Sequence, residues 1–252
     1  MSRIGKLVGV ILTGGTLSFT LASTAGAVVI DLVNGNTGTS NNTIYRWVDQ
    51  QSTGTGVINP FLRIQASGTE QGYNNSCCTN QPWDTKAGIW THDLLLGDLV
   101  TKTIGGLSYY QFLLDINQTG SNPLLSLDNV RIFTRAGAIS TAPNNFSQLG
   151  TLRYNSDVGA QGDTTVELDY SRNPGSGAGD MFMYVPISLF AGVSATDNVY
   201  FYSAFGTPNA TNDGFEEWAV IKRSGGTNVP EPATLALLSL SLAGLSFSRR
   251  RK

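Results

Sequence analysis

The single histidine of this 252-residue chain restricts the catalytic and metal chemistry that the sequence can support. His92 lies in the segment Trp90-Thr91-His92-Asp93, and no Gly-x-Ser-x-Gly nucleophile motif is present. A hydrolytic triad needs a base, usually histidine, beside its nucleophile. A zinc site needs three or four ligands, which one histidine and two adjacent cysteines do not supply. We therefore expect His92 to be a surface or hydrogen-bonded residue, and we assign no catalytic residue.

Three short groups of carboxylate and amide side chains could supply oxygen ligands to calcium. The groups are Asp115 with Asn117, Asp128 with Asn129, and Glu167 with Asp169. Each group lies on one face of an expected strand or beside a turn, and EF-hand spacing is absent. These residues are candidate calcium ligands, with solvated strand and turn positions as the alternative. No other cofactor is expected.

The segment Glu216-Glu217-Trp218 is the best single candidate for polysaccharide cleavage. A glycoside hydrolase needs two carboxyl groups about 5 to 10 Å apart across a cleft, and the indole ring could stack on a sugar. Adjacent residues of a strand point to opposite faces, so Glu216 and Glu217 cannot form the pair by themselves. We therefore expect a protein that is not an enzyme, and a glycosidase or lyase is the weakest alternative.

Tryptophans are the candidate contacts to a polysaccharide. Aromatic residues make up 10% of the chain, and several lie near loops or strand ends. Trp83, Trp90 and Trp218 are the candidate ligand-binding rings, although burial in a core is the more common fate of tryptophan. A carbohydrate-binding module would present such rings together on one exposed face.

Cys77 and Cys78 are adjacent in the polar loop 73–80. Outside the cytoplasm they are expected to oxidise. Adjacent Cα atoms are about 3.8 Å apart, below the usual disulfide range of about 4.4 to 6.8 Å, so a bridge between them would be strained. A local vicinal disulfide, pairing with another chain, and two unpaired cysteines all remain open.

The composition favours strands as the elements that position these residues. Only 13% of residues are charged, 40% are hydrophobic and 29 are glycine, which deprives long surface helices of Glu, Lys and Arg. Short apolar segments between turn-forming clusters predict strands at 28–33, 44–48, 57–65, 107–116, 124–133, 164–170, 181–190, 199–205 and 215–222. A short helix is expected over 91–99. Many short strands without βαβ alternation predict one domain, residues 28–228, with an antiparallel, jelly-roll-like β-sandwich fold.

Residues 1–27 have the order of a secretory signal peptide. Arg3 and Lys6 precede a short apolar stretch, and Ala25-Gly26-Ala27 forms a small-x-small cleavage site. This pattern predicts a signal peptide helix, export through the Sec translocon and cleavage after Ala27 by signal peptidase. Ala25 and Ala27 are the small residues that the peptidase would require.

Residues 229–252 combine three features in a fixed order. Pro230-Glu231-Pro232 is followed by the apolar segment 233–248 and then by Arg249-Arg250-Arg251-Lys252. As a transmembrane helix, about 16 residues would give roughly 24 Å, slightly short of a hydrocarbon core of about 30 Å. The terminal cations are expected to stay in the cytoplasm, which places everything before Pro230 on the far side of the membrane.

This arrangement resembles the PEP-CTERM sorting signal of exported proteins in Gram-negative bacteria. The matching residues are Pro230, Glu231, Pro232 and the terminal Arg249, Arg250 and Arg251. The resemblance implies recognition by an exosortase, with removal or transfer of the tail, in bacteria that make exopolysaccharide and biofilm. It transfers no catalytic residue, because the passenger domains of this group vary widely. A plain tail anchor is the alternative.

The charge of the body argues against nucleic acid as a partner. Residues 1–27 and 229–252 together hold six of the 16 basic residues and one of the 18 acidic residues. The body between them therefore has 10 basic and 17 acidic residues, a net charge of −7, which would repel a phosphate backbone. We therefore expect an exported, non-enzymatic cell-surface or extracellular-matrix protein, held briefly in the membrane by its tail and associated with exopolysaccharide. A carbohydrate-binding module, stabilised or not by calcium, is the alternative.

Overall fold

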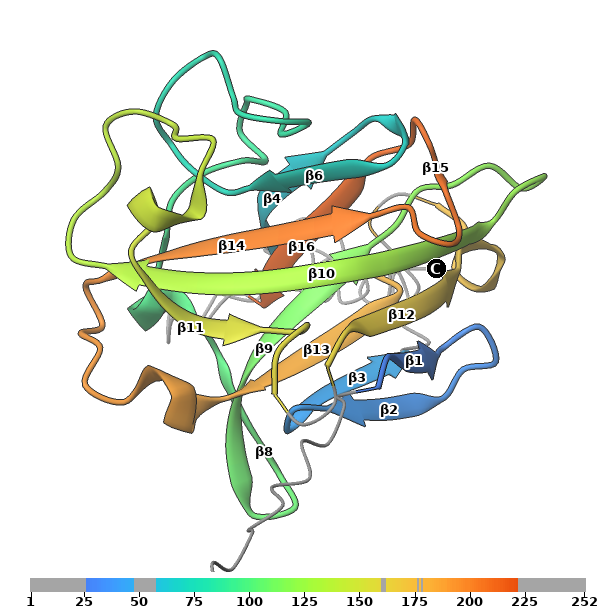
Figure 1. Ribbon diagram of the computed structural model, residues 1–252, viewed down its shortest axis with the longest axis horizontal. Coiled ribbons are helices and arrows are strands. Elements are labelled where there is room, and N and C mark those ends of the chain that lie inside the picture. The colour runs from blue at the N-terminus through green and yellow to red at the C-terminus, as the bar shows by residue number, and fades with distance from the viewer. Residues whose placement is uncertain (1–25, 48–57, 160–161, 176, 178, 222–252) are drawn as a thin grey trace, which may run out of the picture.

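The computed structural model describes residues 26–47, 58–159, 162–175, 177 and 179–221. Two seven-stranded sheets pack face to face, as Figure 1 shows with the sheet that contains β10 and β14 in front. The predicted all-β sandwich is confirmed. Its pairs are antiparallel, except that β1 lies parallel to β12.

The first sheet, called sheet A, has the strand order β1-β12-β10-β14-β6, with β11 paired to β10 and β7 paired to β14. Its strands are β1 (Val28–Asp31), β6 (Glu70–Tyr73), β7 (Leu94–Leu95), β10 (Leu124–Arg135), β11 (Thr151–Asn155), β12 (Thr164–Asp169) and β14 (Asn198–Phe205).

The second sheet, called sheet B, has the order β2-β3-β13-β9-β16-β4, with β8 paired to β9. Its strands are β2 (Thr37–Ser40), β3 (Thr43–Trp47), β4 (Ile58–Ile64), β8 (Thr101–Ile104), β9 (Leu107–Asp115), β13 (Met181–Pro186) and β16 (Glu216–Ile221). A small third sheet pairs β5 (Ser67–Gly68) with β15 (Thr211–Asn212). Short 3-10 turns complete the described part: η1 (Leu96–Asp98), η2 (Phe146–Gln148), η3 (Tyr170–Arg172) and η4 (Ile187–Phe190).

Alternation along the strands builds the main core. In β12, Val166 and Leu168 are buried while Glu167 and Asp169 are only partly covered, as the sequence pattern predicts. Phe201 of β14 and Trp218 of β16 join the two sheets in the core, and their ring centroids lie 4.5 Å apart. Burying such side chains supplies about 25 cal/mol for each Å² of apolar surface removed from water.

Strand β14 is buried on both faces, which explains its apolar sequence. Phe201 and Phe205 enter the core between the sheets. Tyr200 and Tyr202 point the other way, into a second cluster with Tyr73 and Phe133 that covers the outside of sheet A. The loops that carry Trp83 and Phe146 pack on this second cluster.

The helix predicted over 91–99 is wrong. Leu94 and Leu95 instead pair with Val199 and Asn198 at the edge of sheet A, and only a 3-10 turn, η1, follows. Pairing with β14 gives Leu94 and Leu95 an extended backbone conformation, which a helix over this segment would not allow. Among the described residues, no helix is long and apolar enough to span a bilayer. Residues 1–25 of the predicted signal peptide, the C-terminal hydrophobic segment and the sorting motif lie outside the described residues.

Candidate functional site

A two-residue turn of consecutive asparagines forms one wall of a surface pocket. Ser40 of β2 pairs with Thr43 of β3, so Asn41 and Asn42 are the central residues of the hairpin. Both have positive φ, 49° for Asn41 and 62° for Asn42. Hairpin turns of this length favour such angles because they match the strand twist, and asparagine tolerates them better than most residues. The local sequence therefore fixes two neutral amides at the mouth of the pocket.

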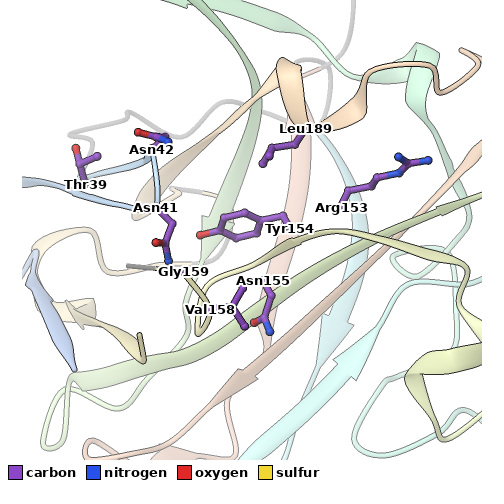
Figure 2. Close-up of a pocket in the computed structure, with 9 residues that line it drawn as sticks. All are labelled: Thr39, Asn41, Asn42, Arg153, Tyr154, Asn155, Val158, Gly159 and Leu189. Carbon is purple, nitrogen blue, oxygen red and sulfur yellow. The ribbon is translucent and has the colours of Figure 1, made fainter. Parts of the chain in front are cut away.

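The pocket encloses about 490 Å³ and lies between this turn, β11 and η4. Figure 2 shows Tyr154 at its centre, with the β2–β3 turn on one side and Arg153 and Leu189 on the other. The lining residues are Thr39, Asn41, Asn42, Arg153, Tyr154, Asn155, Val158, Gly159 and Leu189. They combine neutral hydrogen-bonding groups and one cation with two apolar side chains.

Hydrogen bonds fix the polar side chains of this pocket in place. Asn41 Nδ2 donates to the backbone oxygen of Ser156 at 3.1 Å. Arg153 Nε donates to Thr134 Oγ1 at 2.7 Å. Tyr154 bonds to Tyr45 at its hydroxyl, and burial raises the pKa of Tyr154 above its ordinary value. The pocket is thus organised before a ligand arrives.

The chemistry of the pocket suits binding of a neutral, hydroxyl-rich ligand. Amide groups both donate and accept hydrogen bonds, as sugar hydroxyls require. The nine lining residues include no carboxylate, histidine or cysteine, and the hydroxyl groups among them are those of Thr39 and Tyr154. Val158 and Leu189 are 52% and 37% exposed and give the pocket an apolar side.

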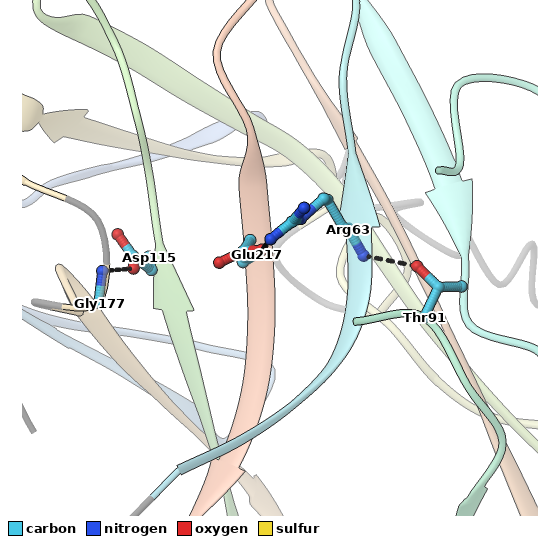
Figure 3. Close-up of polar contacts among 5 residues, drawn as sticks. All are labelled: Arg63, Thr91, Asp115, Gly177 and Glu217. Atoms are coloured by element: carbon cyan, nitrogen blue, oxygen red, sulfur yellow. Dashed lines mark hydrogen bonds and ion pairs between the residues drawn. The ribbon is translucent and has the colours of Figure 1, made fainter. Parts of the chain in front are cut away.

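A second polar feature crosses the outer face of sheet B (Figure 3). Glu217 of β16 lies between Asp115 of β9 and Arg63 of β4 in the strand register. Arg63 forms an ion pair with Glu217. Its guanidinium lies 5.2 Å from the Trp90 ring centroid and 4.6 Å from that of Phe215. The arginine thus links a carboxylate with two aromatic rings by ionic and cation–π contacts.

Asp115 is held differently from Glu217. Its Oδ2 accepts a hydrogen bond from the backbone N–H of Gly177, and only 6% of the residue is exposed. Burial raises the pKa of Asp115 to about 7. Glu217 and Asp115 are neighbours on adjacent strands. The sequence analysis considered only Glu216 and Glu217 as a carboxyl pair and did not identify this one.

The predicted calcium ligands are not brought together. Asp128 accepts from the backbone N–H of Thr207 at 3.0 and 3.1 Å, and Asp169 accepts from that of Ser171 at 2.8 Å to cap η3. Glu167 pairs in register with Asp31 at the β1–β12 junction. The part of the chain that the structure describes holds no group of three or more His, Cys, Asp or Glu placed for a metal ion. Backbone N–H groups already donate hydrogen bonds to the carboxylates of Asp115, Asp128 and Asp169. Calcium binding at Asp115, Asn117, Asp128, Glu167 or Asp169 stays a prediction.

The three candidate tryptophans have different environments. The assignment of Trp218 as a ligand contact is wrong, since the residue is 0% exposed and its Nε1 donates to Ser203 Oγ at 3.0 Å across the core. Its position on the inward face of β16 explains this burial. Trp83 is half-buried against Tyr73 and Tyr202. Trp90 is half-buried beside Arg63.

The cysteines and the histidine lie in the segment between β6 and β7. Cys77 and Cys78 are free thiols in the structure, and Cys78 is the exposed one. Burial and the neighbouring Cys78 raise the pKa of Cys77 to about 12. A disulfide involving either residue stays a prediction. His92 has a local partner, with Nδ1 2.8 Å from the backbone oxygen of Asp93.

The first described strand begins directly after the predicted cleavage site. β1 begins at Val28, directly after Ala27, and the Val28 backbone nitrogen donates to the oxygen of Asp163 at 2.7 Å. Cleavage after Ala27 would leave every residue of β1 in the protein. Ala25 itself lies outside the described residues.

A family model of the PEP-CTERM protein-sorting motif matches residues 228–252. No curated protein and no solved structure matches the chain significantly. The C-terminal resemblance is therefore confirmed: the chain carries the sorting signal of exosortase substrates, which marks it for export and for processing by an exosortase.

Proposed function

We propose that this exosortase-sorted protein works at the cell surface or in the extracellular matrix, where it binds exopolysaccharide without cleaving it. The observation that carries the proposal is the pocket beside the Asn41-Asn42 turn, whose lining is rich in amides and holds no carboxylate. The Sec translocon and signal peptidase would deliver the protein, and the exosortase would release it from transient attachment to the membrane.

The size and preorganisation of the pocket support binding of a saccharide segment. Its volume of about 490 Å³ lies within the range of about 300 to 1,000 Å³ that small-molecule sites occupy. Asn41 and Arg153 are already hydrogen-bonded to the protein, so a ligand would lose little affinity to ordering them. The net charge of −7 between the two end segments favours a neutral polysaccharide over a strongly anionic one.

The carboxyl pair on sheet B supports a non-enzymatic role. A glycosidase needs one acid and one base or nucleophile that reach the same glycosidic bond. Asp115 is 6% exposed, and Glu217 is paired with Arg63. Both groups thus have partners within the protein, and their adjacency makes them the residues to test for cleavage.

The proposal is tested by co-sedimentation of the full-length chain with exopolysaccharide from the bacterium that expresses it. Asn42→Gly keeps the positive φ without strain while it removes the amide, and Arg153→Met removes the guanidinium but keeps the length. Each change is expected to weaken binding by about tenfold, the effect of roughly 1.4 kcal/mol. Asp213→Gly, at a positive-φ turn residue outside the pocket lining, is the matched control and should bind normally.

Two results would overturn the proposal. One is wild-type protein that fails to sediment with any neutral polysaccharide fraction. The other is release of reducing ends that disappears in Asp115→Asn or Glu217→Gln, because it would identify a cleaving enzyme.

A further inference from the structure

A second hollow adjoins the amide-lined pocket described above around Tyr154. It encloses about 490 Å³, the same volume as the amide-lined pocket. Asn42 belongs to the lining of both. The two hollows therefore meet at the β2–β3 turn. The residues that line the second hollow are Asn42, Leu107, Ser108, Tyr109, Pro186, Ile187 and Ser188.

The 3-10 turn η4 also contributes to both linings. Leu189 lines the amide-lined pocket, whereas Ile187 and Ser188 line the second hollow. Phe190 at the end of η4 is buried, and its ring lies edge-on to that of Tyr110 in β9, with 5.1 Å between the centroids. This contact anchors η4 on sheet B, so the two hollows share a wall that the core holds in place.

The chemistry of the second hollow differs from that of the amide-lined pocket. None of its seven lining residues carries a charge, and four of them have apolar or aromatic side chains. Leu107 begins β9, in the hairpin that β8 and β9 extend away from the body of the sandwich (Figure 1), and it is 64% exposed. Ser108 and Ser188 are exposed and add two hydroxyl groups.

Exposed apolar side chains are concentrated along the two hollows. Of the seven large hydrophobic residues that are exposed in the described part of the chain, three line them, namely Leu107, Val158 and Leu189. Exposed apolar surface that is rimmed by polar groups is typical of a binding site. Amides in one hollow and apolar side chains in the next suit a sugar chain, whose units present hydroxyl groups at their edges and C–H groups on their ring faces.

We propose that the two hollows are adjacent subsites for one neutral polysaccharide chain, an assignment that rests on the function proposed above. The chain crosses Asn42 and places its next sugar units against Leu107 and Ile187. The shared residue and the shared wall favour the same chain over a separate ligand, because a polymer held in the amide-lined pocket is already delivered to the second hollow. The uncharged, apolar lining favours a deoxy or acetylated unit there, since its methyl group packs on apolar side chains.

The test measures affinity against chain length by isothermal titration calorimetry of the full-length chain in mild detergent. The probes are disaccharide and octasaccharide fractions of the same exopolysaccharide, prepared by partial acid hydrolysis. The octasaccharides are expected to bind at least about tenfold more tightly than the disaccharides, because only they fill both subsites. Leu107→Ser should weaken octasaccharide binding by about tenfold and leave disaccharide binding within about twofold of the wild type.

Two further variants make the length effect specific. Leu95→Ser changes another exposed leucine, outside both linings, and should bind both fractions normally. Ser188→Trp fills the second hollow without removing apolar surface, and it should have the same selective effect as Leu107→Ser. Leu107 and Ser188 are both exposed, so these changes should leave the free energy of unfolding close to that of the wild type.

The outcomes separate this assignment from the function on which it rests. Equal affinity for the two fractions, or an octasaccharide affinity that neither Leu107→Ser nor Ser188→Trp lowers, would overturn the second subsite and leave the amide-lined pocket as a single site. Disaccharide binding that Asn42→Gly does not weaken would instead contradict the function proposed for the amide-lined pocket. Wild-type protein that binds neither fraction would overturn both.

Discussion

The hydroxyl oxygens of Tyr45 and Tyr154 lie 2.6 Å apart, in a hydrogen bond that joins sheet B to sheet A beneath the amide-lined pocket. Tyr45 belongs to β3 and Tyr154 to β11, and they are 1% and 4% exposed. The same hydrogen bond therefore holds the two sheets together and fixes Tyr154 in the lining of the candidate binding pocket.

Removing this contact is expected to destabilise the protein. Tyr45→Phe deprives the Tyr154 hydroxyl of this buried partner, which should lower the free energy of unfolding by about 1 to 2 kcal/mol. Tyr154→Phe should have a similar effect, and the double variant should lose less than the sum because the two hydroxyls are coupled. Urea unfolding of all four proteins checks the prediction. If the double variant loses the sum of the two single losses in free energy of unfolding, the hydrogen bond between the two hydroxyls makes no net contribution to stability.

Gly214 is expected to be intolerant of any side chain. Gly214→Ala places a Cβ 1.5 Å from the Asn117 backbone oxygen, so the backbone must shift. We expect a loss of at least about 2 kcal/mol in the free energy of unfolding. Gly120→Ala, where a Cβ would meet nothing within 4 Å, is the matched control and should stay within about 0.5 kcal/mol of the wild type. Equal stability of the two variants would contradict the prediction.

The buried aspartates should make the protein less stable as the pH rises. Burial raises the pKa of Asp115 to about 7 and that of Asp180 to about 8, against about 3.9 in the unfolded chain. The folded state therefore holds protons that the unfolded state releases, so this stabilisation is present below about pH 4 and is lost as pH rises to about 8. In EDTA, the free energy of unfolding should fall by about 2 to 5 kcal/mol between pH 5 and pH 8.

Variants assign this pH dependence to the two aspartates. Asp115→Asn and Asp180→Asn should each flatten the decline, whereas the exposed Asp163→Asn should not. A decline that is the same in all four proteins would place its origin in other groups.

Arg63 is expected to stabilise the outer face of sheet B. Arg63→Met keeps the aliphatic length but removes the ion pair with Glu217 and the contacts with the Trp90 and Phe215 rings. The expected loss is about 1 to 2 kcal/mol, because the side chains of the ion pair are 22% and 13% exposed and so only partly screened by water. Lys102→Met on the exposed strand β8 serves as control in urea unfolding. A loss no larger than that of the control would show that these contacts are energetically neutral.

Processing should remove both ends of the chain. Mass spectrometry of the released protein is expected to find Val28 as the first residue and to lack the terminal cluster Arg249-Arg250-Arg251-Lys252. Replacing Pro230-Glu231-Pro232 with three alanines should leave the tail attached and the protein in the membrane fraction, because the exosortase would lose its sorting motif. A released product that retains Lys252 would argue against cleavage by the exosortase.

Much of the strand content follows from local patterns. A strand lies within each of the nine predicted ranges, because alternation and turn-forming clusters reflect which side chains are buried and which face solvent. The prediction over 181–190 was too long, since residues 187–190 form the 3-10 turn η4. Strands such as β6 and β11 escaped prediction because their sequences, Glu-Gln-Gly-Tyr and Thr-Leu-Arg-Tyr-Asn, contain few apolar residues. The adjacent asparagines at 41 and 42 between two strands were a usable signal for the turn, although not for the pocket.

The amino-acid sequence by itself determined the sorting of this protein for export, the all-β class and the acidic charge of its body, because each depends on composition or on residues adjacent in the chain. Tertiary structure alone decided that Glu70 meets Glu216, that Tyr45 meets Tyr154 and that Trp218 is buried. These contacts join residues from opposite sheets, between about 110 and 150 positions apart for the two pairs. Their partners are selected by how the sheets pack and in which register the strands pair, information that no short segment contains.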